Sequence, residues 1–191
     1  SRGLGDVYKR QGYHNQPEVT SQQIVDGWLH TGDLGDVDDE GFITLTGRKK
    51  DLIITAGGKN VSPGQLETTV MTSPVVAQCL VIGDRKPFIA ALITLDLDDA
   101  NAWLASQGAA TADSLEELSK NPIVHAEVER IVNKANEGVS RAESIRKFEI
   151  LPDEFTQANG MLTASLKSRR AQIVDHYRKL IDTVIYVPRK K

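Results

Sequence analysis

The stretch Val-Val-Ala-Gln-Cys-Leu-Val-Ile-Gly-Asp-Arg-Lys-Pro-Phe-Ile-Ala-Ala-Leu-Ile-Thr-Leu, residues 75–95, decides the fold class. It contains two largely apolar runs of strand length, Val75–Ile82 and Phe88–Leu95, separated by the polar segment Gly83–Pro87. Branched apolar residues dominate both runs, and glycine and proline mark the turn, so the pattern predicts an antiparallel pair of strands. Cys79 lies inside the first run and is the single cysteine, which excludes an internal disulfide.

Helical patterns flank these strands on both sides. Upstream, Ser62-Pro63-Gly64-Gln65 predicts a helix start, because serine can cap and proline suits the first helical position. That helix is predicted to end at Ser73, since the following proline disfavours helical geometry there. Downstream, we predict helices at residues 99–107, at residues 122–136 and from about Leu166, and a short strand at residues 146–151. Strands and helices do not alternate regularly, so we predict an α+β fold with small antiparallel sheets flanked by helices.

The first fifty residues are richer in turn-forming residues. Glycine, aspartate, asparagine and proline dominate residues 12–41, which predicts loops and one short helix at residues 16–25. Alternating segments at residues 42–46 and 51–56 predict two strands, joined by the cationic turn Gly47–Lys50. The change in composition places a domain boundary near residues 49–51.

Composition and charge exclude several classes of protein. The 191 residues carry 40% apolar and 26% charged side chains, a globular balance, and a net charge of −3 that does not favour nucleic-acid binding. No apolar run approaches the roughly 20 residues that a membrane helix needs. Residues 1–11 lack the apolar core of a signal peptide, so we expect a cytoplasmic protein. The four histidines are scattered without ligand spacing, so we predict no metal site in this chain.

Two basic clusters are the candidate sites. Lys167 is predicted in the first turn of the last helix, with Arg169 and Arg170 beside it. Cations are unfavourable at a helix N-terminus, so this arrangement indicates either an anion site or side chains that extend into water. The second cluster is Arg48-Lys49-Lys50, followed by Gly57-Gly58, where backbone could approach a ligand closely.

Several motifs occur in the order that adenylate-forming enzymes share. They are Gly27-Trp28-Leu29-His30-Thr31-Gly32-Asp33, Gly47-Arg48-Lys49-Lys50-Asp51, Gly57-Gly58-Lys59-Asn60-Val61-Ser62-Pro63 with Glu67, and Asn159-Gly160-Met161-Leu162-Thr163 through Lys167. From about Gly12 to Val187, the chain resembles the C-terminal part of a long-chain fatty-acid–CoA ligase of the AMP-binding superfamily. Many relatives have glycine before the lysine, whereas Leu166 stands here, in the style of the long-chain branch.

The resemblance implies an ATP-dependent activation of a long-chain fatty acid to its acyl-CoA through an acyl-adenylate. Fatty acid, ATP and CoA are the implied partners, and Mg²⁺ is an implied cofactor whose ligands lie outside this chain. The implied divisions are a non-native start (residues 1–11), the end of the large AMP-binding domain (12–49), a mobile C-terminal domain (50–187) and a basic tail (188–191). Without the rest of the large domain, we expect this fragment to be inactive.

The resemblance also assigns roles to individual residues. Lys167 matches the catalytic lysine that reaches the reacting carboxylate and the α-phosphate. Asp33 matches the aspartate that holds the ribose hydroxyls, and an ionised carboxylate suits a diol. The other matches are Arg48 near the ribose and phosphates, Lys50 at the hinge of the mobile domain, and Gly57, Gly58 and Lys59 along the CoA channel.

Two alternatives remain open at this point. The chain could belong to an adenylation domain that loads a carrier protein, whose acceptor is also a pantetheine thiol. It could instead be a stand-alone nucleotide-binding regulatory module that uses Asp33 and the basic clusters. Peripheral membrane contact is left open by the sequence, and nucleic acid is not an expected partner.

Overall fold

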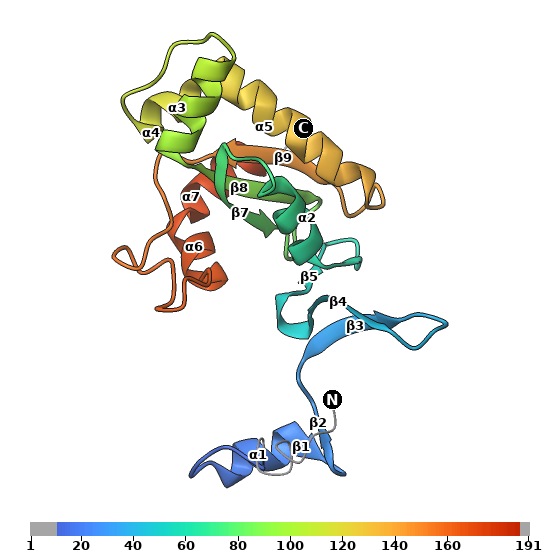
Figure 1. Cartoon of the computed structure of the whole chain (residues 1–191). Coiled ribbons are helices and arrows are strands. Elements are labelled where there is room, and N and C mark those ends of the chain that lie inside the picture. Colours follow the sequence, from blue (N-terminus) through green and yellow to red (C-terminus); the bar gives the residue numbers. More distant parts are fainter. Residues whose placement is uncertain (1–10, 188–191) are drawn as a thin grey trace. The chain divides into compact units, whose positions relative to one another are not determined.

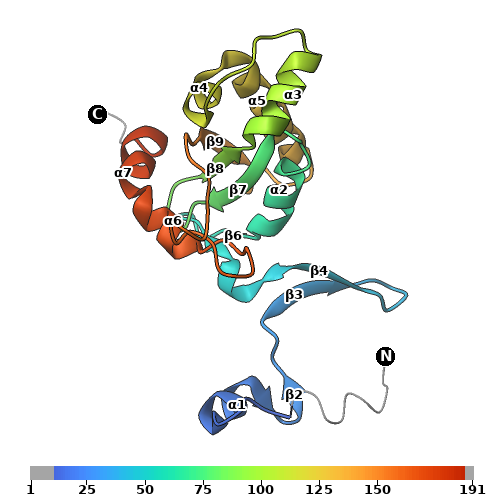
Figure 2. The same cartoon turned by 60° about the vertical axis from the view of Figure 1, so that its left-hand side comes forward.

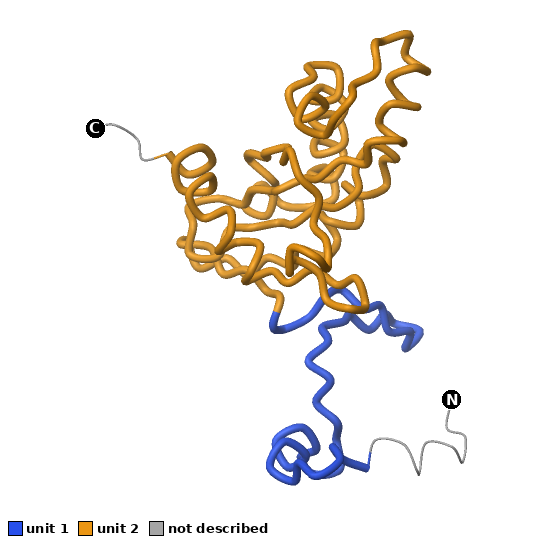
Figure 3. Tube along the Cα trace, turned by 90° about the vertical axis from the view of Figure 1, so that its left-hand side faces the viewer, with its two compact units in different colours: residues 1–50 blue, residues 51–191 orange. Residues whose placement is uncertain are grey.

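The computed structural model describes residues 11–187 and divides into two compact units, Ser1–Lys50 and Asp51–Lys191 (Figure 3). The predicted basic tail at residues 188–191 lies outside the described residues, and so does the predicted non-native start except for Gln11. Among residues 11–187, no helix has both the length and the apolar character needed to cross a membrane.

Unit 1 is made of short elements. They are α1 (Pro17–Gln23), β1 (Ile24–Val25), β2 (Trp28–Leu29), β3 (Asp33–Val37), β4 (Ile43–Arg48) and the first part of the 3₁₀ helix η2 (Lys49–Asp51). Strand β1 pairs with β2 and β3 pairs with β4, both antiparallel. Asp38 closes the β3–β4 turn, because its Oδ1 accepts hydrogen bonds from the backbone N–H groups of Glu40 and Phe42 at 3.0 and 2.8 Å.

The strand expected at residues 42–46 has a different partner from the predicted one. It pairs with β3, and Gly47 and Arg48 continue the strand instead of forming a cationic turn. The expected partner, residues 51–56, contributes only β5 (Ile53–Ile54), which pairs with β6 (Asn60–Val61). The acidic residues of β3 suggested loop, but a two-stranded hairpin exposed on both faces can carry polar side chains throughout.

Unit 1 has no core of its own within the described part of the chain. No residue between 11 and 50 is buried. Large apolar side chains are exposed instead, including Trp28 at 77%, Ile43 at 71% and Phe42 at 66%. Exposed apolar side chains in this density are typical of a surface that another part of a protein covers.

Unit 2 is built around one three-stranded sheet. Its strands are β7 (Val76–Ile82), β8 (Ile89–Leu95) and β9 (Ile145–Ile150), in the order β7-β8-β9. The predicted antiparallel hairpin β7–β8 is confirmed, but β9 pairs with β8 in parallel. A parallel partner needs a long crossover, and here the helices between residues 97 and 137 provide it. The predicted α+β class is confirmed, with one parallel pair that the hairpin pattern did not indicate.

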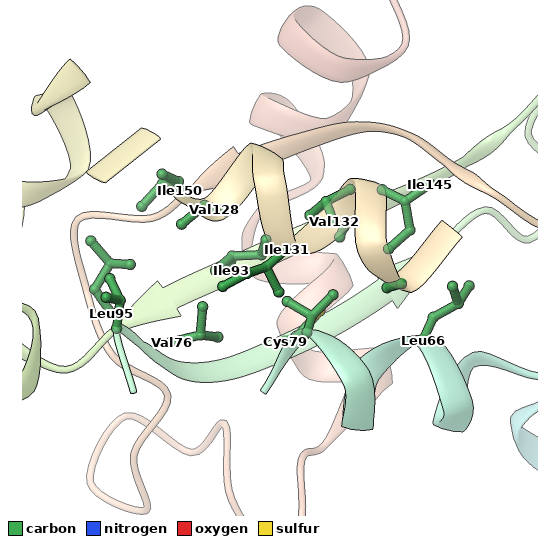
Figure 4. Packing of buried hydrophobic residues seen from close by; sticks show 14 of the residues in the cluster. Leu66, Val76, Cys79, Ile93, Leu95, Val128, Ile131, Val132, Ile145 and Ile150 are labelled. Atoms are coloured by element: carbon green, nitrogen blue, oxygen red, sulfur yellow. The ribbon is translucent and has the colours of Figure 1, made fainter. Parts of the chain in front are cut away.

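Helices cover both faces of this sheet (Figures 1 and 2). The first face carries α2 (Pro63–Val70), α3 (Leu97–Ser106), α4 (Leu115–Lys120) and α5 (Pro122–Glu137). The second face carries α6 (Arg170–His176), α7 (Arg178–Leu180) and the π-helical segment η3 (Ile181–Ile185). Figure 4 shows Val128, Ile131 and Val132 of α5 packed over Ile93 and Cys79 of the sheet.

Strand β8 contributes side chains to both cores. Ile93 belongs to the core under α5, and its neighbour Leu92 belongs to the core under α6, and neither is exposed to solvent. Successive side chains of a strand point to opposite faces, so a strand covered on both sides is apolar at every position. The continuous apolar run seen in the sequence therefore marks the central strand of unit 2.

Two helix ends differ from the prediction. Helix α2 ends at Val70 and not at Ser73, and α6 begins at Arg170 and not near Leu166. Leu166 has a φ of 59°, in the left-handed region, so the chain cannot be helical there. The residues before Arg170 form a loop instead, and this loop carries Lys167.

Candidate functional site

Lys167 lies in a hydrogen-bonded loop, residues 161–169, which we call the lysine loop. Thr163 closes its tip: its N–H donates to the Lys167 carbonyl at 2.9 Å, and its Oγ1 accepts from the Lys167 N–H at 3.0 Å. The base of the loop is closed by a hydrogen bond from the Arg169 N–H to the Met161 carbonyl at 2.8 Å. Met161 and Leu162 are buried in the core under α6, so the loop has a fixed base and an exposed tip.

The prediction that Lys167 occupies the first turn of the last helix is wrong. Lys167 precedes α6 by three residues, and the left-handed conformation of Leu166 produces the turn that presents it. Leu166 itself is exposed. The unfavourable cation at the helix start is therefore Arg170, and Arg170 has a carboxylate partner.

An open cavity of about 630 Å³ lies beside the lysine loop in unit 2. Its charged lining residues are Asp51, Glu67, Lys167 and Arg170. The uncharged residues around them are Met71, directly after α2, residues 77–80 of β7, and Leu166 and Ser168 of the lysine loop. The cavity therefore brings a catalytic-lysine candidate close to a second cation and two carboxylates, all within one unit.

Glu67 on α2 pairs with Arg170 at the start of α6. The Arg170 Nη2 donates to Glu67 Oε1, and its Nη1 donates to the Val81 carbonyl at 3.1 Å. The same Glu67 oxygen accepts from the Val81 N–H at 2.7 Å. Burial raises the pKa of Glu67 above its usual value, and Arg170 and the Val81 N–H partly offset this. The three segments α2, β7 and α6 are thus joined through one ion pair.

Asp33 and Arg48 form the corresponding pair in unit 1. They face each other across β3 and β4, and Arg48 Nε donates to Asp33 Oδ1 at 2.9 Å. The Asp33 side chain is 28% exposed and that of Arg48 is 63% exposed. The Asp33 N–H is held by Thr31 Oγ1 at 3.1 Å. The fold therefore leaves the remaining oxygen of Asp33 and most of the guanidinium open to a ligand.

The β5–β6 turn carries the three residues predicted for the CoA channel. Gly58 has a φ of 76°, a conformation that glycine adopts without strain, and a side chain there would meet no atom within 4 Å. Gly57 is similarly open, since a Cβ atom at this position would meet only Thr55 Oγ1, at 3.9 Å. Lys59 Nζ lies 3.8 Å from Glu143 Oε1. Lys59 thus has a weak carboxylate partner within unit 2.

Lys50 lies in η2, and the division between the two compact units falls directly after it. The predicted site residues thus form two groups, Asp33 with Arg48 in unit 1, and Lys167 with its cavity in unit 2. Within residues 11–187, no group of three or more histidine, cysteine, aspartate or glutamate side chains is placed to hold a metal ion. These residues therefore do not fit a magnesium site.

Sequence reasoning missed the pairing of Glu67 with Arg170. Glu67 belongs to the glycine-rich motif and Arg170 to the basic cluster, but 103 positions separate them, and no local pattern connects them. A weak indication did exist. Glu67 lies between the core residues Leu66 and Val70 on a short helix, so partial burial of its carboxylate could have been expected.

Comparison with known proteins identifies a family that matches most of this chain. The model of the AMP-binding enzyme C-terminal domain matches residues 50–187. The long-chain-fatty-acid–CoA ligase FadD15 of Mycobacterium tuberculosis is 43% identical over 173 residues, which cover 91% of this chain and 29% of that protein. The long-chain-fatty-acid–CoA ligase ACSBG2 of Gallus gallus is 36% identical, covering 94% of this chain and 27% of that protein. The chain thus spans less than a third of the length of these curated relatives.

Among solved structures, the A-PCP didomain of carboxylic acid reductase from Segniliparus rugosus, in complex with AMP, is similar. Its TM-score is 0.67 at 26% identity, covering 93% of this chain and 23% of that chain.

Proposed function

Because the chain belongs to the AMP-binding enzyme C-terminal domain family, we propose that it is the C-terminal portion of an ATP-dependent long-chain fatty-acid–CoA ligase. The observation that carries this proposal is the exposed Lys167 at the tip of an anchored loop, beside an open cavity. Fatty-acid–CoA ligases at 43% and 36% identity support the substrate class.

In the first half-reaction, a carboxylate oxygen of the fatty acid attacks the α-phosphorus of ATP. The bond to the bridging oxygen of the β-phosphate breaks, and pyrophosphate leaves. Negative charge increases on the phosphoryl oxygens during this displacement, and a positioned ammonium group stabilises it more strongly than water does. Lys167 is the residue to which we assign this role. Its exposed position fits a group whose partner is a ligand supplied from outside unit 2.

Asp33 and Arg48 are assigned to the nucleotide. A carboxylate accepts two hydrogen bonds from a ribose diol, and Arg48 engages Oδ1 of Asp33, which leaves Oδ2 to accept from a hydroxyl. The Arg48 guanidinium keeps further N–H groups for a phosphate. Their mutual ion pair gives each side chain a defined direction before the nucleotide binds.

In the second half-reaction, the CoA sulfur attacks the acyl carbon and AMP leaves with the bonding electrons. We propose that Lys50 is the hinge between the two half-reactions, since the division into compact units falls directly after it. Gly57 and Gly58 leave room for the pantetheine arm, since neither would place a Cβ in close contact. Lys59, held only at 3.8 Å by Glu143, can exchange that partner for a CoA phosphate.

The remaining parts of this enzyme are proposed to lie in sequence outside the chain. Residues 12–49 are assigned to the end of a large AMP-binding domain, because residues 11–50 bury no side chain and expose several large apolar ones. We place the Mg²⁺ ligands and the acyl tunnel in that domain, and residues 50–187 form the mobile domain. The chain by itself is then inactive, and the protein is assigned to the cytoplasm.

Replacement of Lys167 in the complete protein that carries this sequence tests the proposal. Lys167→Ala is expected to lower acyl-adenylate formation by about 10²- to 10³-fold. Thioester formation from supplied acyl-adenylate should change by less than about threefold, because the proposed turn of the mobile domain at Lys50 presents Gly57–Lys59 in place of Lys167 in that step. The measurements are ATP–pyrophosphate exchange and acyl-CoA release.

Arg169→Ala, two residues further in the same loop, is the matched control and should leave both rates near wild type. Equal loss of both half-reactions in Lys167→Ala would refute the assigned role.

A carrier-protein-loading adenylation domain is the second candidate, favoured by the similarity to the A-PCP didomain. Both candidates transfer the acyl group to a pantetheine thiol, so the acceptor distinguishes them. Turnover with free CoA at a rate equal to or above that with a pantetheinylated carrier supports the ligase. Transfer to the carrier alone supports the second candidate.

A further inference from the structure

We propose that Glu67 and Arg170 are positioning residues that hold the lysine loop, and with it Lys167, in its working orientation. The effect of this positioning on catalysis rests on the proposed function. The positioning itself is a property of unit 2 and can be measured without any assay of activity. Neither residue is proposed to touch the reacting atoms.

Arg170 is the point where the lysine loop meets the rest of unit 2. It is the first residue of α6 and follows the last residue of the loop, Arg169. Its guanidinium makes two hydrogen bonds to residues outside the loop. One is to Glu67 on α2, and the other, at 3.1 Å, is to the Val81 carbonyl on β7. Because Glu67 also accepts from the Val81 N–H at 2.7 Å, the three groups form a closed triangle. A closed triangle fixes Arg170 more tightly than a single ion pair does.

The other end of the loop is fixed by burial. Met161 is 3% and Leu162 is 6% exposed, and both pack in the core under α6. Between these two anchors, the loop is held by its own hydrogen bonds around Thr163 and by one weak contact from outside it, from Gln157 Nε2 to the Ala164 carbonyl at 3.4 Å. Within residues 11–187, no side chain holds Lys167 Nζ by an ion pair or hydrogen bond. The direction of Lys167 therefore depends on the backbone of the loop, and the backbone depends on its two anchors.

Because the Glu67–Arg170 pair is largely buried, water cannot easily take the place of either partner. The side chains of Arg170 and Glu67 are 26% and 16% exposed, well below the values of the solvent-exposed pairs in unit 2 such as Arg178 with Asp175, at 70% and 72%. Loss of either partner leaves a charge in a poorly hydrated position. Without Glu67, the Arg170 side chain is free to turn into the cavity, which it lines together with Lys167. The loop would then lose an anchor, and Lys167 would gain a competing cation.

The first test separates the two half-reactions in the complete protein. Glu67→Gln and Arg170→Gln are expected to lower acyl-adenylate formation by about 10- to 100-fold, the effect of a displacement near 1 Å. Thioester formation from supplied acyl-adenylate should stay within about threefold, the pattern expected for Lys167→Ala. Arg170→Lys keeps the charge but cannot reach both Glu67 and the Val81 carbonyl as a fork, so it should restore part of the rate.

Epistasis with Lys167 distinguishes positioning from a general structural role. In the Lys167→Ala background, Glu67→Gln should reduce the residual adenylation by less than about twofold, since residues that act as one unit are not additive. The matched control is Lys86→Gln, which removes the 2.7 Å ion pair between Lys86 and Asp182. That pair ties η3 to the β7–β8 turn, and both of its residues lie outside the lysine loop. Lys86→Gln should leave the ratio of the two half-reactions unchanged.

Hydrogen exchange measures the positioning without any activity. In Glu67→Gln, the amides of Leu166, Lys167 and Arg169 should exchange about tenfold faster or more, while β8 stays protected. Lys86→Gln should not change these amides. If the wild type forms no acyl-adenylate but the loop amides respond as described, the proposed function fails and the positioning stands. Unchanged loop protection, an equal loss of both half-reactions, or full additivity with Lys167→Ala overturns the positioning.

Discussion

Arg48 and Asp33 are direct cross-strand partners, and Arg48 Nε donates to Asp33 Oδ1 at 2.9 Å. The pair lies where β3 begins and β4 ends, at the edge of the hairpin closest in sequence to Lys50. An exposed ion pair of this kind contributes little to stability, on the order of 0–1 kcal/mol. The ion pair therefore acts mainly by orienting two side chains that we assign to nucleotide binding.

Asp33→Asn tests the nucleotide assignment. The substitution keeps the shape but removes the charge, so the KM for ATP should rise about 10- to 100-fold, the range of a charged hydrogen bond. Steady-state kinetics with ATP varied gives the measurement. Asp36→Asn, an exposed carboxylate on the same strand, is the matched control and should leave the KM unchanged. A similar KM in both variants contradicts the role of Asp33.

Lys59→Ala tests the CoA channel. The rate of thioester formation should fall, mainly through a higher KM for CoA of about 5- to 20-fold, while adenylation is unchanged. Its ion pair with Glu143 is long, 3.8 Å, so the loss of stability should stay below about 1 kcal/mol. Lys120→Ala, on the exposed side of α4, is the control. If adenylation falls together with the thioester step, the assignment is wrong.

Leu166 offers a test of the loop conformation. Its φ of 59° is costly for leucine, and its exposed side chain loses little packing when removed. Leu166→Gly should leave stability unchanged or raise it by up to about 1 kcal/mol, since relief of strain is opposed by the entropy of glycine in the unfolded chain. Leu166→Val should lower it by about 1 kcal/mol, because a β-branched residue fits this region poorly. Urea unfolding of the chain measures both.

The stability contribution of Glu67 should depend on pH. Burial raises the pKa of Glu67 in the folded chain above its value of 4.5 in the unfolded chain, so the folded state binds the proton more tightly. The free energy of unfolding of wild type, relative to that of Glu67→Gln, is therefore highest below the pKa of Glu67 in the unfolded chain. This difference falls as the pH rises through the pKa of Glu67 in the folded chain. Unfolding free energies of the two proteins from pH 4 to pH 8 give the difference, and a trend in the opposite direction contradicts the burial of this carboxylate.

Cys79 should be chemically inert in the folded chain. Burial raises the pKa of its thiol, and the Glu67 charge raises it further, so very little reactive thiolate forms near neutral pH. A disulfide reagent should modify the folded chain only at the rate of unfolding, and should modify one thiol per chain in denaturant. Rapid modification without denaturant would show that β7 is accessible.

Local patterns predicted the elements of unit 2 well. The β7–β8 hairpin and the long helix α5 follow from apolar periodicity and from glycine and proline positions, all of which act over a few residues. The same rules placed the last helix too early. We predicted its start at about Leu166, but hydrogen bonds around Thr163 and the left-handed Leu166 close a loop there instead.

The sequence by itself determined the β7–β8 hairpin and the helices α2, α3 and α5, the family resemblance and the candidate residues Asp33, Arg48 and Lys167, because these depend on residue types and short spacings. Tertiary structure alone decided that β9 joins β8 in parallel and that Arg170 pairs with Glu67 across 103 positions. Such pairings depend on how helices pack over the two faces of the central strand, and the short-range periodicity of a sequence does not indicate that packing.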